Sequence, residues 1–195
     1  MSKNSFKVLR PGINTTFQDL GRDNLYHVGL PFSGAIDKRN FLIANSLVTN
    51  REDDAALEFA YQGPLLEFSG SKTSIVITGN VNFKIIKKDT SEIKGECYRT
   101  YDLNNKDCLD IISTEKSVYG YLSVKGGFQL DKFCNSYSTT VRAEVGPNDG
   151  KKIEIGQTII LNASESSIEK SLEYLNSKIE FIRGIKGTNF DYFSE

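Results

Sequence analysis

Apolar and polar residues alternate along most of this chain, in short runs separated by turns that contain glycine or proline. Alternation of this kind is typical of β-strands with one buried face. It predicts strands at residues 6–10, 57–61, 66–68, 74–78, 82–87, 108–112, 119–124 and 179–183, and a hairpin at 153–161. So many short strands favour a closed or strongly curved antiparallel sheet.

Two segments depart from this alternation and predict helices. Phe41, Ala44 and Leu47 recur at helical spacing and predict a buried helix, for which Asp37 is the expected N-cap. Residues 166–177 are polar, with apolar residues at the same spacing, and predict a short surface helix. The expected fold class is therefore mainly β (β-rich α+β), with one or two short helices.

Composition excludes several classes of function. The 195 residues are enough for one substantial hydrophobic core. A net charge of −1 gives no electrostatic case for binding nucleic acid or a membrane surface, and no run approaches the ~20 apolar residues of a membrane helix. Three cysteines without a CxxC motif favour reduced thiols and a cytoplasmic location. Because His27 is the only histidine, no metal site is expected.

The segments that carry candidate chemistry also resemble a known family. They are PGINTTFQDLGR at residues 11–22, GLPFSGAID at 29–37 and ANSLVTN at 44–50, with shorter matches in order at 56–58, 77–79, 121–127, 136–139 and 182–184. Together they resemble the biotin-dependent carboxyltransferase family, which includes the C subunit of 5-oxoprolinase, KipA and part of urea carboxylase. The resemblance implies a cyclophilin-like β-barrel, with residues 1–178 as an N-terminal half and 179–195 as the start of a second half.

The resemblance further implies a subunit of an ATP-dependent 5-oxoprolinase-type hydrolase, which converts the cyclic amide 5-oxoproline to glutamate. It would act with a PxpB/KipI-like partner and a PxpA-like subunit. One alternative is biotin-dependent carboxyl transfer to urea, with biotin on a separate carrier. Another is a non-enzymatic KipA-like regulator that binds a kinase inhibitor. ATP is implied by the resemblance only, since no phosphate-binding G-x-x-x-x-G-K-[ST] loop occurs.

Three residues are the catalytic candidates. Arg22 is either a clamp for a carboxylate or phosphate, or an arginine tied to Asp19 or Asp37 that holds the loop in shape. Ser33 can donate to an oxyanion, with the amide of Gly34 beside it. Asp37 is either the helix N-cap or part of the site, and the cap is favoured.

The substrate-binding candidates line the same predicted loops or follow them. They are Thr15, Thr16, Gln18, Gly34, Asn45, Glu58, Ser136 and Arg142. Asn45 is favoured as a structural hydrogen-bonding residue. Glu58 is expected to pair with an arginine, or else to be a base with a shifted pKa. Relatives carry an arginine where this chain has Tyr137, and Arg142 is the expected substitute.

Overall fold

The computed structural model describes residues 3–162 and 169–173. Within these residues the chain forms one α-helix, three short 3-10 helices and a series of short strands. The strands are β1 Ser5–Arg10, β2 Thr16–Gln18, β3 Ala56–Ala60, β4 Leu65–Ser69, β5 Lys72–Thr78, β6 Val81–Ile86, β7 Glu92–Lys94, β8 Thr100–Asn104, β9 Cys108–Thr114, β10 Tyr119–Val124 and β11 Thr158–Ile160. The helices are α1 Lys38–Leu47, η1 Tyr26–Val28, η2 Val141–Ala143 and η3 Asn148–Gly150.

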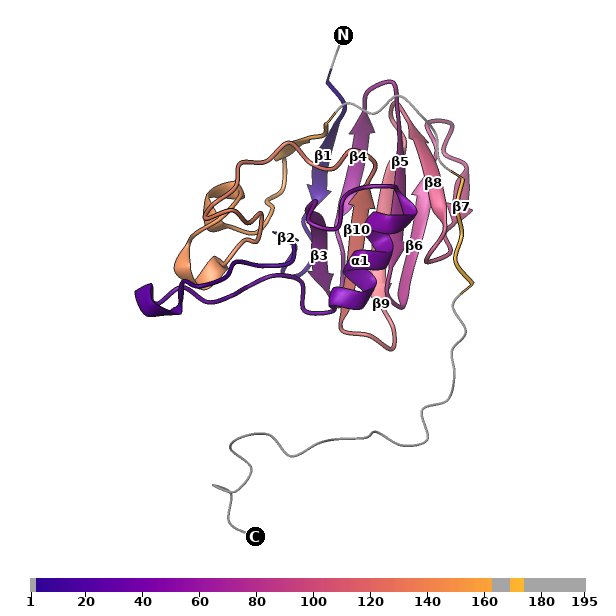
Figure 1. Cartoon of the computed structure of the whole chain (residues 1–195). Coiled ribbons are helices and arrows are strands. Elements are labelled where there is room, and N and C mark those ends of the chain that lie inside the picture. Colours follow the sequence, from indigo (N-terminus) through magenta and orange to yellow (C-terminus); the bar gives the residue numbers. More distant parts are fainter. Residues whose placement is uncertain (1–2, 163–168, 174–195) are drawn as a thin grey trace.

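The strands form two antiparallel sheets, which confirms the mainly β expectation (Figure 1). One sheet has the order β11-β1-β4-β9-β6-β7, and the other has the order β2-β3-β10-β5-β8. Fully buried residues of both sheets share one hydrophobic core, for example Phe6 and Phe68 from the first sheet and Phe59 and Ile77 from the second. The two sheets therefore pack face to face, and removing this apolar surface from water is the main stabilising contribution.

The five-stranded sheet is buried on both faces because α1 covers its outer side. Along β10, Leu122 faces the core between the sheets, whereas Tyr121 faces Phe41 and Ala44 of α1. Figure 1 shows α1 lying across β10 and β5. The result is a three-layer arrangement of helix, sheet and sheet.

Helix α1 begins as the sequence predicts. The Oδ1 atom of Asp37 accepts a hydrogen bond of 3.0 Å from the amide of Asn40, and Oδ2 accepts one of 2.7 Å from the Asn40 side chain. A carboxylate in this position satisfies an amide that the first turn of a helix leaves without a partner. The N-cap prediction for Asp37 is confirmed.

Two predictions near the C-terminal end are wrong where the structure describes them. Residues 153–155 form no strand, and β11 pairs with β1 instead of closing a hairpin, while the amide of Ile153 donates to Thr15 O. Residues 169–173, expected in a helix, are extended, and Ser171 forms a β-bridge with Arg99. The rest of that helix, the strand at 179–183 and the expected domain boundary lie outside the described residues.

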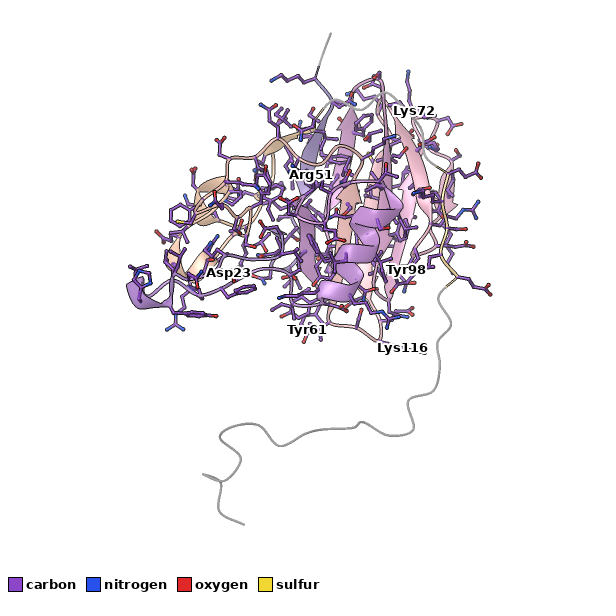
Figure 2. The ribbon with its side chains drawn as sticks, viewed as in Figure 1. Asp23, Arg51, Tyr61, Lys72, Tyr98 and Lys116 are labelled. Atoms are coloured by element: carbon purple, nitrogen blue, oxygen red, sulfur yellow. The ribbon has the colours of Figure 1, made fainter. Side chains whose placement is uncertain are left out.

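Two loop regions that are distant in sequence lie side by side beside the sheets (Figure 1). We call residues 19–35 and 133–150 together the loop lobe. Backbone hydrogen bonds hold it: Arg22 N donates to Phe32 O at 2.8 Å, and Thr139 N donates to Phe17 O at 2.9 Å. In Figure 2, Asp23 marks this lobe, and Tyr98 lies on the other side of α1. Across the described residues, no helix has the length and apolar character needed to cross a membrane.

Candidate functional site

A buried carboxylate organises the loop lobe. Asp19, only 3% exposed, accepts hydrogen bonds from four groups. The donors are Gly21 N at 2.8 Å, Ser136 Oγ at 2.8 Å, Ser138 Oγ at 2.5 Å and Tyr137 N at 2.5 Å. Asp19 thereby joins residues 19–21 to residues 136–138. Charge-assisted bonds of this kind hold both loops in one geometry.

Arg22 is buried next to this carboxylate but does not contact it. The residue is 2% exposed, its Nη1 atom donates to Thr140 Oγ1 at 2.7 Å, and its Nη2 atom donates to Ser138 O. Among the described residues, no carboxylate lies within ion-pair distance of Arg22, and its Nε atom has no hydrogen-bond partner. Burial lowers the pKa of Arg22, while Asp19 acts in the opposite direction. The expected tie to Asp19 or Asp37 is therefore not formed as a direct ion pair.

Ser33 meets Thr140 at the same point. Their hydroxyl oxygens are 2.5 Å apart, and Ser33 Oγ also lies 3.5 Å from Nη1 of Arg22. The backbone of Ser33 is left-handed, with φ of 57°, which is a costly conformation for a residue other than glycine. Gly34 follows with φ of 90°, and a Cβ atom there would lie 2.8 Å from Gly21 N. Glycine is therefore required at 34 for close packing of the two loop segments.

A cleft of about 560 Å³ opens beside this cluster, between η1 and η2. Its walls include the following residues: Tyr26, Leu30, Pro31, Thr140, Arg142 and Ala143. We call it the lobe cleft. Arg142 is exposed at the cleft, and none of the ion pairs between described residues includes it. The lobe cleft combines apolar walls, a hydroxyl and a guanidinium, a combination typical of sites for small polar ligands.

A second polar cluster lies where α1 meets the five-stranded sheet. Glu58 Oε2 accepts a hydrogen bond of 2.7 Å from the Tyr121 hydroxyl and one of 2.9 Å from the amide of Ile36. The Tyr121 hydroxyl in turn accepts from the amide of Asp37 at 2.7 Å. Burial raises the pKa of Glu58, and it also raises the pKa of Tyr121. The expected arginine partner of Glu58 is replaced by a tyrosine.

The remaining candidates form hydrogen bonds within the protein, although the buried Oε1 atom of Gln18 has no partner among the described residues. Thr15 Oγ1 donates to Pro11 O at 2.6 Å, and Gln18 Nε2 donates to Thr16 Oγ1 at 2.9 Å. Asn45, as favoured from the sequence, is structural, since it donates to Asp54 O at 2.7 Å and accepts from Ser123 at 2.9 Å. Its contacts are with the loop after α1 and with β10, so the structure does not bring Asn45 into the loop lobe.

The list of substrate-binding candidates does not include two residues that are central to the cluster, Ser138 and Thr140. The signal that finds them is the spacing of hydroxyl residues at 136, 138 and 140. In extended backbone a spacing of two places side chains on one side. Ser136 and Ser138 accordingly both reach Asp19, and Thr140 reaches Arg22.

No group of three or more histidine, cysteine, aspartate or glutamate residues is arranged to hold a metal ion in residues 3–162 and 169–173. The site contains a carboxylate, hydroxyls, backbone amides and two guanidinium groups. The hydroxyls, amides and guanidinium groups are donors that can bind and orient an anion by charge and hydrogen bonding.

Comparison with known proteins identifies relatives of this chain. The chain is 30% identical to urea amidolyase of Saccharomyces cerevisiae over 90% of this chain and 9% of that protein. It is 31% identical to the C subunit of 5-oxoprolinase of Haemophilus influenzae over 74% of this chain and 45% of that protein. It thus spans a small part of urea amidolyase and about half of the oxoprolinase polypeptide.

A solved structure agrees with these sequence relatives. The crystal structure of the urea amidolyase of Kluyveromyces lactis superimposes with a TM-score of 0.76 at 29% identity, over 88% of this chain and 10% of that one. The family model described as carboxyltransferase domain, subdomain A and B, matches residues 28–195. The chain therefore belongs to the carboxyltransferase domain family, as the motifs at 29–37, 44–50 and 136–139 indicate.

Proposed function

We propose that this chain is part of a subunit of an ATP-dependent 5-oxoprolinase-type hydrolase, which opens the lactam ring of 5-oxoproline to give glutamate. The similarity to the C subunit of 5-oxoprolinase supports this proposal. In the proposal the chain works with a PxpB/KipI-like subunit and a PxpA-like subunit. The observation that carries it is the position of Arg22 in the loop lobe. This buried cation is bonded to Thr140, which lines the lobe cleft, and no carboxylate among the described residues contacts Arg22.

The chemistry assigns this chain a binding and orienting role. Amide resonance protects a lactam from attack by water, and ATP supplies the activation by phosphorylating the amide oxygen. The N-terminus of α1 does not suit a phosphate, because Asp37 already places a carboxylate there. We infer that another subunit holds ATP, and that this chain holds the substrate in the loop lobe.

Reconstitution of the complex tests the proposal. The chain is co-expressed with its PxpB/KipI-like and PxpA-like partners, and the formation of glutamate from 5-oxoproline is measured with and without ATP. We expect turnover that requires ATP and all three polypeptides. Turnover at the same rate without this chain would contradict the proposal, and would favour the KipA-like regulator instead.

Carboxyl transfer from biotin to urea or a related amide is the second candidate. The similarity to urea amidolyase supports it, since that similarity extends over 90% of this chain. Adding avidin to the reconstituted complex separates the two candidates. Turnover of 5-oxoproline that continues with avidin present excludes the biotin-dependent reaction. Carboxylation of urea that avidin abolishes favours it.

A further inference from the structure

The hydroxyl pair of Ser33 and Thr140 holds more hydrogen atoms than its surroundings accept. Arg22 Nη1 donates to Thr140 Oγ1 at 2.7 Å and approaches Ser33 Oγ at 3.5 Å. The two hydroxyl oxygens are 2.5 Å apart, so one of their two protons lies between them. Among the described residues, neither hydroxyl has another acceptor. One proton is therefore available to a group from outside.

Thr140 lines the lobe cleft. In the arrangement in which Ser33 donates to Thr140, the Thr140 proton has no acceptor among the described residues and is available to a ligand in the cleft. Arg22 polarises the Thr140 hydroxyl by donating to its oxygen. The best acceptor for a proton polarised by a cation is an anionic oxygen, because charge-assisted hydrogen bonds are the stronger class.

The charge balance of the site points to the same ligand. Arg22 is buried near Asp19, which compensates its charge at a distance but does not contact it. Arg142 at the cleft has no ion-pair partner among the described residues. A guanidinium without a direct carboxylate partner favours an anionic oxygen that can contact it. The walls formed by Leu30, Pro31 and Ala143 are apolar and suit a compact carbon skeleton.

We propose that the lobe cleft is a subsite for a small carboxylate on an apolar body, in which Thr140 donates to the carboxylate and Arg142 pairs with it. Arg22 acts through Thr140 as a positioning residue. The subsite rests on the proposed function only for the choice of probe, L-5-oxoproline. Its recognition chemistry follows from the hydroxyl pair and the two guanidinium groups.

Calorimetric titration of the full 195-residue chain tests the subsite. The probes are L-5-oxoproline, 2-pyrrolidinone, which is the same ring without the carboxylate, and inorganic phosphate. We expect oxoproline to bind at least about tenfold more tightly than pyrrolidinone. Equal binding of the two rings, no binding of oxoproline, or binding of phosphate alone overturns the proposal.

Variants identify the groups that bind the carboxylate. Arg142→Ala, at an exposed position, and Thr140→Val each weaken oxoproline binding about tenfold, whereas Thr140→Ser retains it. Arg99→Ala removes an exposed arginine next to β8, the strand farthest from β2 in its sheet, and leaves binding unchanged. Wild-type affinity in both Arg142→Ala and Thr140→Val overturns the proposal. Normal binding without turnover in the complex overturns the proposed function and leaves the subsite standing.

Discussion

At the scale of single residues, Asp19 connects the two segments of the loop lobe. Its carboxylate accepts four hydrogen bonds from two separate loops, and it is almost completely buried. Asp19→Asn replaces an acceptor oxygen by a donor that faces amide and hydroxyl donors. We expect a loss of about 2–4 kcal/mol in the free energy of unfolding, measured by urea denaturation.

Asp23 offers a matched control four residues away. It is exposed and is labelled on the loop lobe in Figure 2. Asp23→Asn makes the same chemical change without burying an unsatisfied group, and we expect it to change stability by less than about 0.5 kcal/mol. Equal effects of the two substitutions would show that Asp19 does not organise the lobe.

Glu58 makes the stability of the protein depend on pH. Burial raises the pKa of Glu58 above its ordinary value of 4.5, and Asp37 contributes in the same direction. A carboxyl with a raised pKa binds its proton more tightly in the folded state, so stability falls as the pH rises from 4.5 through the folded pKa. Glu58→Gln stays neutral and retains an acceptor for Tyr121.

The comparison of Glu58→Gln with the wild type checks this sign. Urea unfolding at pH 4 and pH 7.5 is expected to show that the variant gains stability relative to the wild type as the pH rises. A difference that is constant between the two pH values would mean that the burial of Glu58 does not shift its pKa.

At the scale of elements, the first turn of α1 depends on Asp37. Replacing this cap by alanine leaves the amide of Asn40 without its side-chain acceptor. We expect Asp37→Ala to lower the free energy of unfolding by about 1 kcal/mol in thermal or urea unfolding, and Asp37→Ser to restore most of it. Because serine caps the helix without a charge, full turnover of the Asp37→Ser complex would assign Asp37 to structure alone.

Elements with one clear apolar pattern could be predicted from the sequence. Strands β1, β5, β6, β9 and β10 and helix α1 match their predictions to within a few residues. Strand β8 was missed because it lies at a sheet edge and carries the half-exposed residues Tyr101 and Asp102. The prediction of a hairpin at 153–161 was wrong. Alternation marks Ile153 as buried but does not say which residue it pairs with, and the amide of Ile153 bonds to the distant residue Thr15.

The types of residue in the site could be predicted from the sequence, but the contacts between them could not. The loop residues Asp19, Arg22 and Ser33 stand out by type, and the structure does bring them together. Their partners Ser138 and Thr140 come from more than 100 positions later in the chain. That proximity depends on how the two loops cross beside the sheets, which no local pattern records.

At the scale of the whole molecule, we call the two sheets the body. The body and the tip of the loop lobe differ in their burial and in their backbone hydrogen bonds. Where both partners are described, residues 25–30 make only local backbone bonds, such as Val28 N to Leu25 O and Gly29 N to Tyr26 O, and no residue of η1 is buried. Strands β5 and β10 are buried on both faces. Opening of the lobe tip is expected to cost much less than opening of the body.

Hydrogen exchange measured by mass spectrometry checks this difference. Peptides that cover residues 23–31 are expected to exchange much faster than peptides from β5 and β10. In Asp19→Asn, exchange is expected to accelerate at residues 133–140 and to stay unchanged in the strands of the body. Uniform acceleration across the chain would instead indicate that lobe and body unfold as one unit.

Residues 169–173 run along the segment that leads into β8, the outer strand of the five-stranded sheet. The amide of Thr100 donates to Lys170 O, and that of Leu172 donates to Tyr98 O. An open strand edge is a template on which other chains can pair and grow into fibrils. The short segment occupies backbone groups of Tyr98 and Thr100, which are then not available to a neighbouring molecule.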